Sequence, residues 1–163
     1  MRHDGNDVVV GGAAIGACAL RETLVAVAAA LAGARKPWWV IAGAACALHG
    51  AADEIADVDV LLDEGDAMRL LPPLGLSPAP GEPHPRFRSV LFATWRDLPI
   101  PVEFIAGFAI ATTTGWHDVR PVTRERHRIG NAIVFTPARA ELAAMLTLSG
   151  RPGDLARARR LLA

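Results

Sequence analysis

Hydrophobic side chains recur at helical spacing in the first part of the chain, and apolar runs too short for helices follow. Aliphatic residues three or four positions apart predict a helix with one apolar face from about Ala13 or Ala14 to Ala34. The residues of this stripe are Leu20, Leu24, Val27 and Leu31. Gly33 and Pro37 are expected to end the helix, because neither continues a helix well.

Short apolar runs bounded by glycine, proline or charged residues predict buried strands. The predicted strands are Trp38–Ala42, Asp57–Leu62, Phe87–Ala93, Val102–Ala106 and Ile133–Phe135. The predicted helices after the first are Ala44–His49, Asp66–Leu74, Ala138–Ser149 and Leu155–Leu162. Thr136 and Asp154 are expected to cap the last two helices, and the polar stretch Thr112–Arg128 predicts a loop with a short helix. This order predicts an α/β (α+β) fold with a mixed, twisted sheet of about four to six strands and helices mainly on one face.

Length and charge narrow the class of protein. The 163 residues predict a single domain over residues 1–163, with residues 1–10 as a loose tail. A hydrophobic fraction of 52% is enough to form a core. The 17 basic and 17 acidic residues balance, so the chain lacks the positive field of a general nucleic-acid-binding protein.

The apolar stretch near the start resembles neither a membrane span nor a secretion signal. Arg21 and Glu22 interrupt it before it reaches the roughly 18–20 residues that a span requires. The residues before it carry two aspartates and one arginine, which is a poor positive region for a signal peptide. We therefore expect a cytoplasmic protein that does not contact membranes.

Two carboxylates one residue apart carry the strongest chemical signal. Asp57 and Asp59 lie in an apolar run, and residues i and i+2 of a strand point to the same face. Two neighbouring carboxylates repel each other, so they require a cation or a raised pKa. A divalent ion that carries a phosphate meets this need, although two aspartates at a strand end can also simply cap loops. Glu103 is a further acid inside an apolar strand.

The residues before these acids resemble a known family. Residues 43–50 read GAACALHG, and Asp57-Val58-Asp59 follows seven residues after Gly50. This pattern is similar to that of the DNA polymerase beta-like nucleotidyltransferase superfamily. Residues 136–162 are similar to the tail of its small bacterial members, the abortive-infection toxin and antibiotic adenylyltransferase branches, which suggests a toxin–antitoxin-like role.

The resemblance implies a site and a reaction. Asp57, Asp59 and Glu103 would be the catalytic residues and would hold one or two Mg²⁺ or Mn²⁺ ions. The helix start at Gly43, Ala44 and Ala45 would bind the phosphates of a nucleoside triphosphate, with Gly43 allowing a sharp turn of the backbone. A nucleoside monophosphate would pass to a hydroxyl of a small molecule, a protein or an RNA. Many minimal members of the superfamily resemble halves of a working site, so the resemblance also implies a homodimer or a partner protein.

Several positions depart from the family pattern. Ala44 replaces a glycine or serine, Asp53 and Ile55 stand where an arginine and a threonine are common, and Leu146 or Thr147 stands where a lysine is common. The arginines that could replace these phosphate-binding groups are Arg86, Arg88, Arg124, Arg126 and Arg128. The departures keep two alternatives open: a binding or interaction module that lost the activity, and a metal phosphohydrolase that uses the same acids.

The histidines give no comparable signal. The chain has five, and His3, His84, His117 and His127 show no metal-ligand spacing, so the sequence predicts no zinc site. His49 is interpreted as a packed histidine of the short helix.

Overall fold

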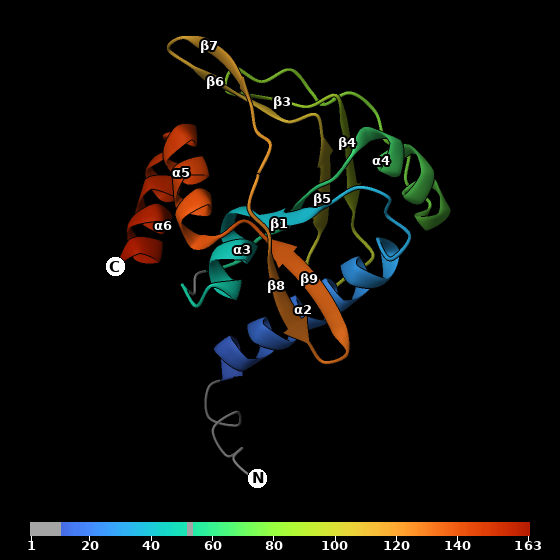
Figure 1. Cartoon of the computed structure of the whole chain (residues 1–163). Helices are drawn as coiled ribbons and strands as arrows, with labels where there is room; N and C mark the ends of the chain where they lie inside the picture. Colours follow the sequence, from blue (N-terminus) through green and yellow to red (C-terminus); the bar gives the residue numbers. More distant parts are fainter. Residues whose placement is uncertain (1–10, 52–53) are drawn as a thin grey trace.

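A four-stranded mixed sheet, in the order β1-β2-β5-β4, lies at the centre of the molecule (Figure 1). The computed structural model describes residues 11–51 and 54–163, so the expected tail at residues 1–10 and Asp53 lie outside the described part. The strands are β1 (Trp39–Ile41), β2 (Val58–Leu61), β4 (Leu91–Trp95) and β5 (Val102–Ala106). β2 and β5 are parallel, whereas β1 and β4 pair antiparallel at the two edges. The mixed α/β fold expected from the sequence is therefore confirmed.

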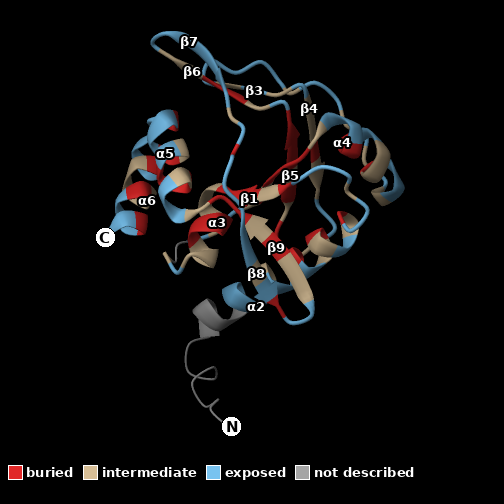
Figure 2. Ribbon diagram, viewed as in Figure 1, coloured by how far each residue is buried: buried red, intermediate tan, exposed pale blue. Residues whose placement is uncertain are grey.

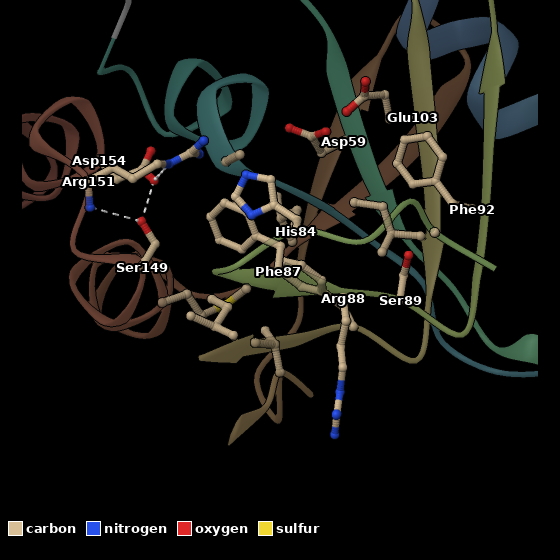
Figure 3. A pocket seen from close by; sticks show the side chains of 18 of the residues that line it. Asp59, His84, Phe87, Arg88, Ser89, Phe92, Glu103, Ser149, Arg151 and Asp154 are labelled. Atoms are coloured by element: carbon tan, nitrogen blue, oxygen red, sulfur yellow. Dashed lines mark hydrogen bonds and ion pairs between the residues drawn. The ribbon is translucent and has the colours of Figure 1, made fainter. Parts of the chain in front are cut away.

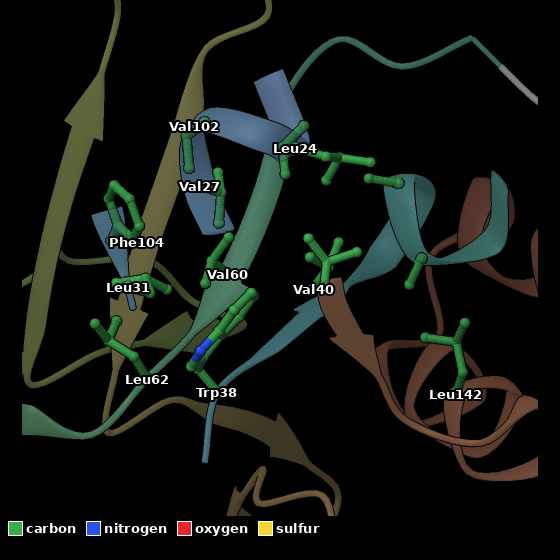
Figure 4. Close-up of a cluster of buried hydrophobic side chains, with 14 of the residues drawn as sticks. Leu24, Val27, Leu31, Trp38, Val40, Val60, Leu62, Val102, Phe104 and Leu142 are labelled. Atoms are coloured by element: carbon green, nitrogen blue, oxygen red, sulfur yellow. The ribbon is translucent and has the colours of Figure 1, made fainter. Parts of the chain in front are cut away.

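The two faces of this sheet have different roles. Val58 and Val60 of β2 are fully buried on the face that packs against the apolar stripe of α2 (Figure 4). Burying each such aliphatic side chain stabilises the fold by about 1.5–3 kcal/mol. Asp59, which lies between them, points to the opposite face, where Ile41, Leu61 and Ile105 form a second, smaller apolar cluster. The alternation along β2 thus separates the core from the acids.

The helices lie around the central sheet: in Figures 1 and 2, α2 lies below it, α4 at the right, and α5 and α6 at the left. Their bounds are α2 (Gly11–Ala30), α3 (Ala42–Leu48), α4 (Glu64–Leu70), α5 (Arg139–Ser149) and α6 (Pro152–Leu162), with a 3-10 turn η1 (Pro72–Leu74) after α4. The first helix ends four residues before the predicted Ala34, in a turn. No helix within the described residues combines the length and apolar character that crossing a bilayer requires.

Two small sheets complete the fold, and they correct the prediction of a loop over Thr112–Arg128. One sheet has the order β3-β6-β7, and the other is the hairpin β8-β9. Their strands are β3 (Phe87–Arg88), β6 (Ala109–Thr112), β7 (Gly115–Asp118), β8 (Glu125–Ile129) and β9 (Ala132–Thr136). All four residues of β7 are exposed, so it lacks the alternation of apolar and polar residues that would identify a strand.

Three further element predictions are wrong in detail. The predicted strand Phe87–Ala93 is divided into β3 and β4, which pair in different sheets, because the chain leaves one sheet at Ser89 and Val90. Thr136 is not a helix cap: Ala138 occupies that position of α5, and the Thr136 hydroxyl donates to the Pro137 carbonyl instead.

The last helix also begins earlier than predicted. Pro152 is its first residue, so Arg151 and not Asp154 is its N-cap residue. Proline suits the first helical position because its missing N–H has no partner there in any case. Asp154 therefore lies within the first turn, where its carboxylate is free to hold arginine side chains.

Candidate active site

The three predicted carboxylates meet at one place on the sheet. Asp59 on β2 pairs in register with Glu103 on β5, and Asp57 immediately precedes β2. One carboxylate oxygen from each of these three residues lies within 4.8 Å of the other two. The parallel pairing of β2 with β5 creates this cluster, because side chains at paired positions project from the same face.

The cluster concentrates negative charge in a partly enclosed space. Burial, the charge of Asp57, and a hydrogen bond and charge from Glu103 raise the pKa of Asp59 well above its ordinary value, and Arg151 opposes this increase. Asp59 therefore holds a proton more readily than a free aspartate does when no cation is present. Carboxylate oxygens are the ligands that Mg²⁺ and Mn²⁺ prefer, so this donor set fits the predicted ion.

The acids line a cavity of about 400 Å³ that is otherwise mostly apolar (Figure 3). One wall is aromatic: the rings of His84 and Phe87 stack with centroids 5.1 Å apart, and Phe87 stacks on Phe108 at 5.9 Å. Leu142, Met145 and Leu146 of α5 also line it. A cavity with charge at one place and flat apolar surface nearby suits a molecule with a phosphate and a ring system.

Arg151 supplies positive charge to this cavity, although no sequence pattern marked it as a site residue. Its Nε lies 3.0 Å from Oδ2 of Asp154, which is only 3% exposed. Arg157 Nη1 contacts the other oxygen of Asp154 at 3.1 Å. The Arg151 guanidinium also lies 4.8 Å from the centre of the Phe87 ring. Asp154 thus positions Arg151 beside the aromatic wall. Arg151 and Phe87 of that wall lie far apart in the sequence.

The arginines proposed from the sequence as replacements contribute less. Arg88 lines the cavity, but its guanidinium lies 4.5 Å over the Trp116 ring and points away from the acids in Figure 3. The other four candidates are not among the residues that line this cavity. They are Arg86, Arg124, Arg126 and Arg128.

The predicted phosphate-binding turn lies one residue earlier than expected. The backbone of Ala42 has φ 58°, in the left-handed region that non-glycine residues rarely adopt, and Ala42 lines the cavity. Gly43 does not have a positive φ, and a Cβ there would make only ordinary contacts, the nearest at 3.5 Å from Ile55. Ala44 and Ala45 are fully buried, so only backbone groups of these residues could reach a phosphate.

Two of the residues that depart from the family pattern, Ile55 and Leu146, are buried or partly buried in the structure. Ile55 packs against the main core, and Leu146 lies in the cavity wall with little exposure. Neither side chain carries a charge that could bind a phosphate.

Solved structures share this architecture. A candidate nucleotidyltransferase from Thermotoga maritima matches with a TM-score of 0.65 and 20% identity over 86% of this chain and 90% of that chain. An antigenic nucleotidyltransferase-like protein from Paracoccidioides brasiliensis matches with a TM-score of 0.57 and 14% identity over 90% and 75% of the two chains. The protein ANT(2″)-Ia, in complex with adenylyl-2″-tobramycin, matches with a TM-score of 0.53 and 13% identity over 86% of each chain.

No protein-family model matches the chain, and no curated protein does. The structural matches nevertheless agree with one another. The chain has the nucleotidyltransferase fold, as the resemblance in the sequence implied.

Proposed function

We propose that the protein is a metal-dependent nucleotidyltransferase that moves a nucleoside monophosphate from a nucleoside triphosphate to a hydroxyl. The convergence of Asp57, Asp59 and Glu103 at one end of a cavity, in a chain with this fold, is the observation that carries the proposal. An inactive descendant has no need to keep three repelling carboxylates together, because their proximity costs stability.

The chemistry follows from where these groups lie. The acceptor oxygen attacks the α-phosphorus, a new P–O bond forms, and the bond to the leaving pyrophosphate breaks. Glu103, with Asp59 beside it, accepts the proton of the acceptor hydroxyl. A divalent ion held by Asp57, Asp59 and Glu103 would neutralise charge on the phosphates when bound.

The remaining cavity residues bind and orient the substrates. Arg151 is held by Asp154 in a position to neutralise phosphate oxygens, and an arginine forms strong paired hydrogen bonds with such groups. The wall formed by His84, Phe87 and Phe108 offers a flat surface on which a base or an aromatic acceptor can stack. Backbone N–H groups after Ala42 would add phosphate contacts.

A thermal-shift panel tests the proposal directly. The melting temperature is measured with each of four nucleoside triphosphates, with and without Mg²⁺ or Mn²⁺, for the native protein and for the double variant Asp57→Asn, Asp59→Asn. The double variant Asp97→Asn, Asp118→Asn is the matched control, because it removes two exposed carboxylates outside the cavity. We expect an ion-dependent increase with at least one triphosphate in the native protein and the control, and its loss in the first variant.

The reaction products distinguish the alternatives. Incubation with the stabilising triphosphate and acceptors of each class should release pyrophosphate. Inorganic phosphate released without an acceptor would instead identify a phosphohydrolase. The absence of any ion-dependent shift with all four triphosphates would favour a binding module that lost the activity.

A further inference from the structure

A second group of potential metal ligands lies at the other end of α3 from the cavity. Ala42, the first residue of α3, lines the cavity, whereas His49 follows its last residue. One ring nitrogen of His49, one of His127 and a carboxylate oxygen of Glu125 lie within 4.8 Å of one another. None of the three residues lines the cavity that contains Asp57, Asp59 and Glu103.

Hydrogen bonds restrain both imidazole rings. His49 Nε2 lies 2.9 Å from the carbonyl oxygen of Pro137, which can only accept, so this nitrogen carries a proton. The Thr136 hydroxyl, which is fully buried, donates to the same carbonyl and therefore accepts from His127 Nε2 at 2.8 Å. The same hydroxyl oxygen lies 3.1 Å from His49 Nε2, so the hydrogen bonds of both rings meet at Thr136. A neutral imidazole keeps one nitrogen lone pair that can bind an ion.

This arrangement is typical of histidines that bind metals. A metal-binding histidine usually donates its other N–H to a protein oxygen, which fixes the ring and its tautomer. The two rings meet edge to face, with centroids 5.2 Å apart.

The backbone of β8 places two of the three side chains on one face. Glu125 and His127 are two residues apart on β8 and so project from the same face of the hairpin. Arg126 and Arg128 alternate with them and lie on the opposite face of the strand. The hairpin β8-β9 and the end of α3 lie close together in Figure 1, although His49 and Pro137 are 88 positions apart in the chain.

We propose that His49, Glu125 and His127 form a binding site for a transition-metal ion, with Zn²⁺ as the best fit. Two imidazole nitrogens and one carboxylate oxygen are a ligand set that Zn²⁺ favours, whereas the three carboxylates of the cavity suit Mg²⁺ or Mn²⁺. The ion ties the end of α3 to the β8-β9 hairpin. The spacing of the histidines predicted no zinc site, because the three ligands come from two distant segments.

Metal binding by the purified, chelator-treated chain tests this site without any nucleotide. Zn²⁺ is titrated by calorimetry, Co²⁺ binding is followed by its visible absorption, and the melting temperature is measured with each ion. We expect one Zn²⁺ equivalent, and a rise of about 5–10 °C in melting temperature at a free Zn²⁺ concentration one hundred times the Kd.

Variants show whether Zn²⁺ binds at these three residues or elsewhere in the chain. His127→Gln and the exposed Glu125→Gln should each weaken Zn²⁺ binding at least tenfold, with circular dichroism confirming that both fold. His117→Gln, on β7, and the double variant Asp57→Asn, Asp59→Asn should bind Zn²⁺ as the native chain does. Unchanged binding in His127→Gln and Glu125→Gln, or binding lost only in the double aspartate variant, would overturn the proposal and leave the nucleotidyltransferase proposal untouched.

Discussion

Asp59 and Glu103 lie directly opposite each other on the parallel strands β2 and β5, with both carboxylates on the cavity face of the sheet. The register Val58↔Val102 fixes this pair, because these valines are buried on the other face and a shift by one residue would exchange the faces. The packing of the core therefore holds two carboxylates together. Their repulsion lowers the stability of the fold unless a cation or a proton is bound.

The substitution Asp59→Asn should stabilise the protein when no divalent ion is present. A raised pKa in the folded state means that ionised Asp59 destabilises the fold above its ordinary pKa of 3.8. We expect the free energy of unfolding to increase by about 1 kcal/mol at pH 7, and the melting temperature by about 2–4 °C. The measurement is a thermal melt in EDTA.

The sign of the pH dependence provides the control. The difference between Asp59→Asn and the native protein should close as the pH falls through the folded-state pKa of Asp59, because the native side chain is then protonated as well. A variant that is less stable than the native protein in EDTA at pH 7 would show that the carboxylates do not repel each other.

Glu103→Gln should remove most of the transfer activity while the fold is kept. The carboxamide preserves the volume of the side chain but can neither accept the acceptor's proton nor balance a bound cation. We expect kcat to fall by about 100-fold or more. The measurement is pyrophosphate release under saturating substrates, with Glu22→Gln as the matched control, since Glu22 is exposed on α2. Equal kcat values for the two variants would exclude Glu103 from the reaction.

Arg151→Gln should weaken triphosphate binding, because Arg151 supplies positive charge that Asp154 directs to the cavity. Loss of one charge-assisted hydrogen bond costs about 1.5–3 kcal/mol, which is about a 10- to 100-fold increase in Kd. Calorimetric titration with the preferred triphosphate measures this, and Arg159→Gln on the exposed face of α6 is the matched control. If both variants bind equally well, Arg151 does not contact the phosphates.

Asp66→Asn should destabilise the protein at neutral pH. Burial alone would raise the pKa of Asp66, but hydrogen bonds from the Arg35 and Lys36 N–H groups and the Arg69 side chain outweigh it and lower the pKa. Asp66 is 2% exposed, and an amide NH₂ facing these donors would leave them unsatisfied. We expect a loss of about 2–3 kcal/mol in the free energy of unfolding, measured by urea denaturation at pH 7.

The pH dependence of that loss follows from the lowered pKa. The stabilisation by Asp66 is complete above the ordinary pKa of 3.8 and disappears as the pH falls through the lower folded-state value. The native protein and Asp66→Asn should therefore converge in stability only as the pH falls below 3.8 and through the lower folded-state pKa, whereas Asp97→Asn, at an exposed site, should match the native protein throughout. A difference that stays constant down to pH 2 would contradict this assignment.

Local patterns predicted the parts of the fold whose residues are strongly apolar. The strand Val102–Ala106 has the predicted bounds, because its side chains are mostly buried and its sequence is bounded by Pro101 and Gly107. β7 and β8 were missed because most of their residues are exposed and neither strand contains an apolar run. The division of Phe87–Ala93 between two sheets depends on partners elsewhere in the chain and leaves no local signal.

The sequence by itself determined that Asp57 and Asp59 lie close together at the start of a buried strand, because only one residue separates them. Only the tertiary structure decided that Glu103 joins them, that Arg151 lies beside Phe87 in the cavity, and that His49 meets Glu125 and His127. The physical reason is that strand pairing and helix packing join segments that lie far apart in the chain, and these contacts depend on the core as a whole.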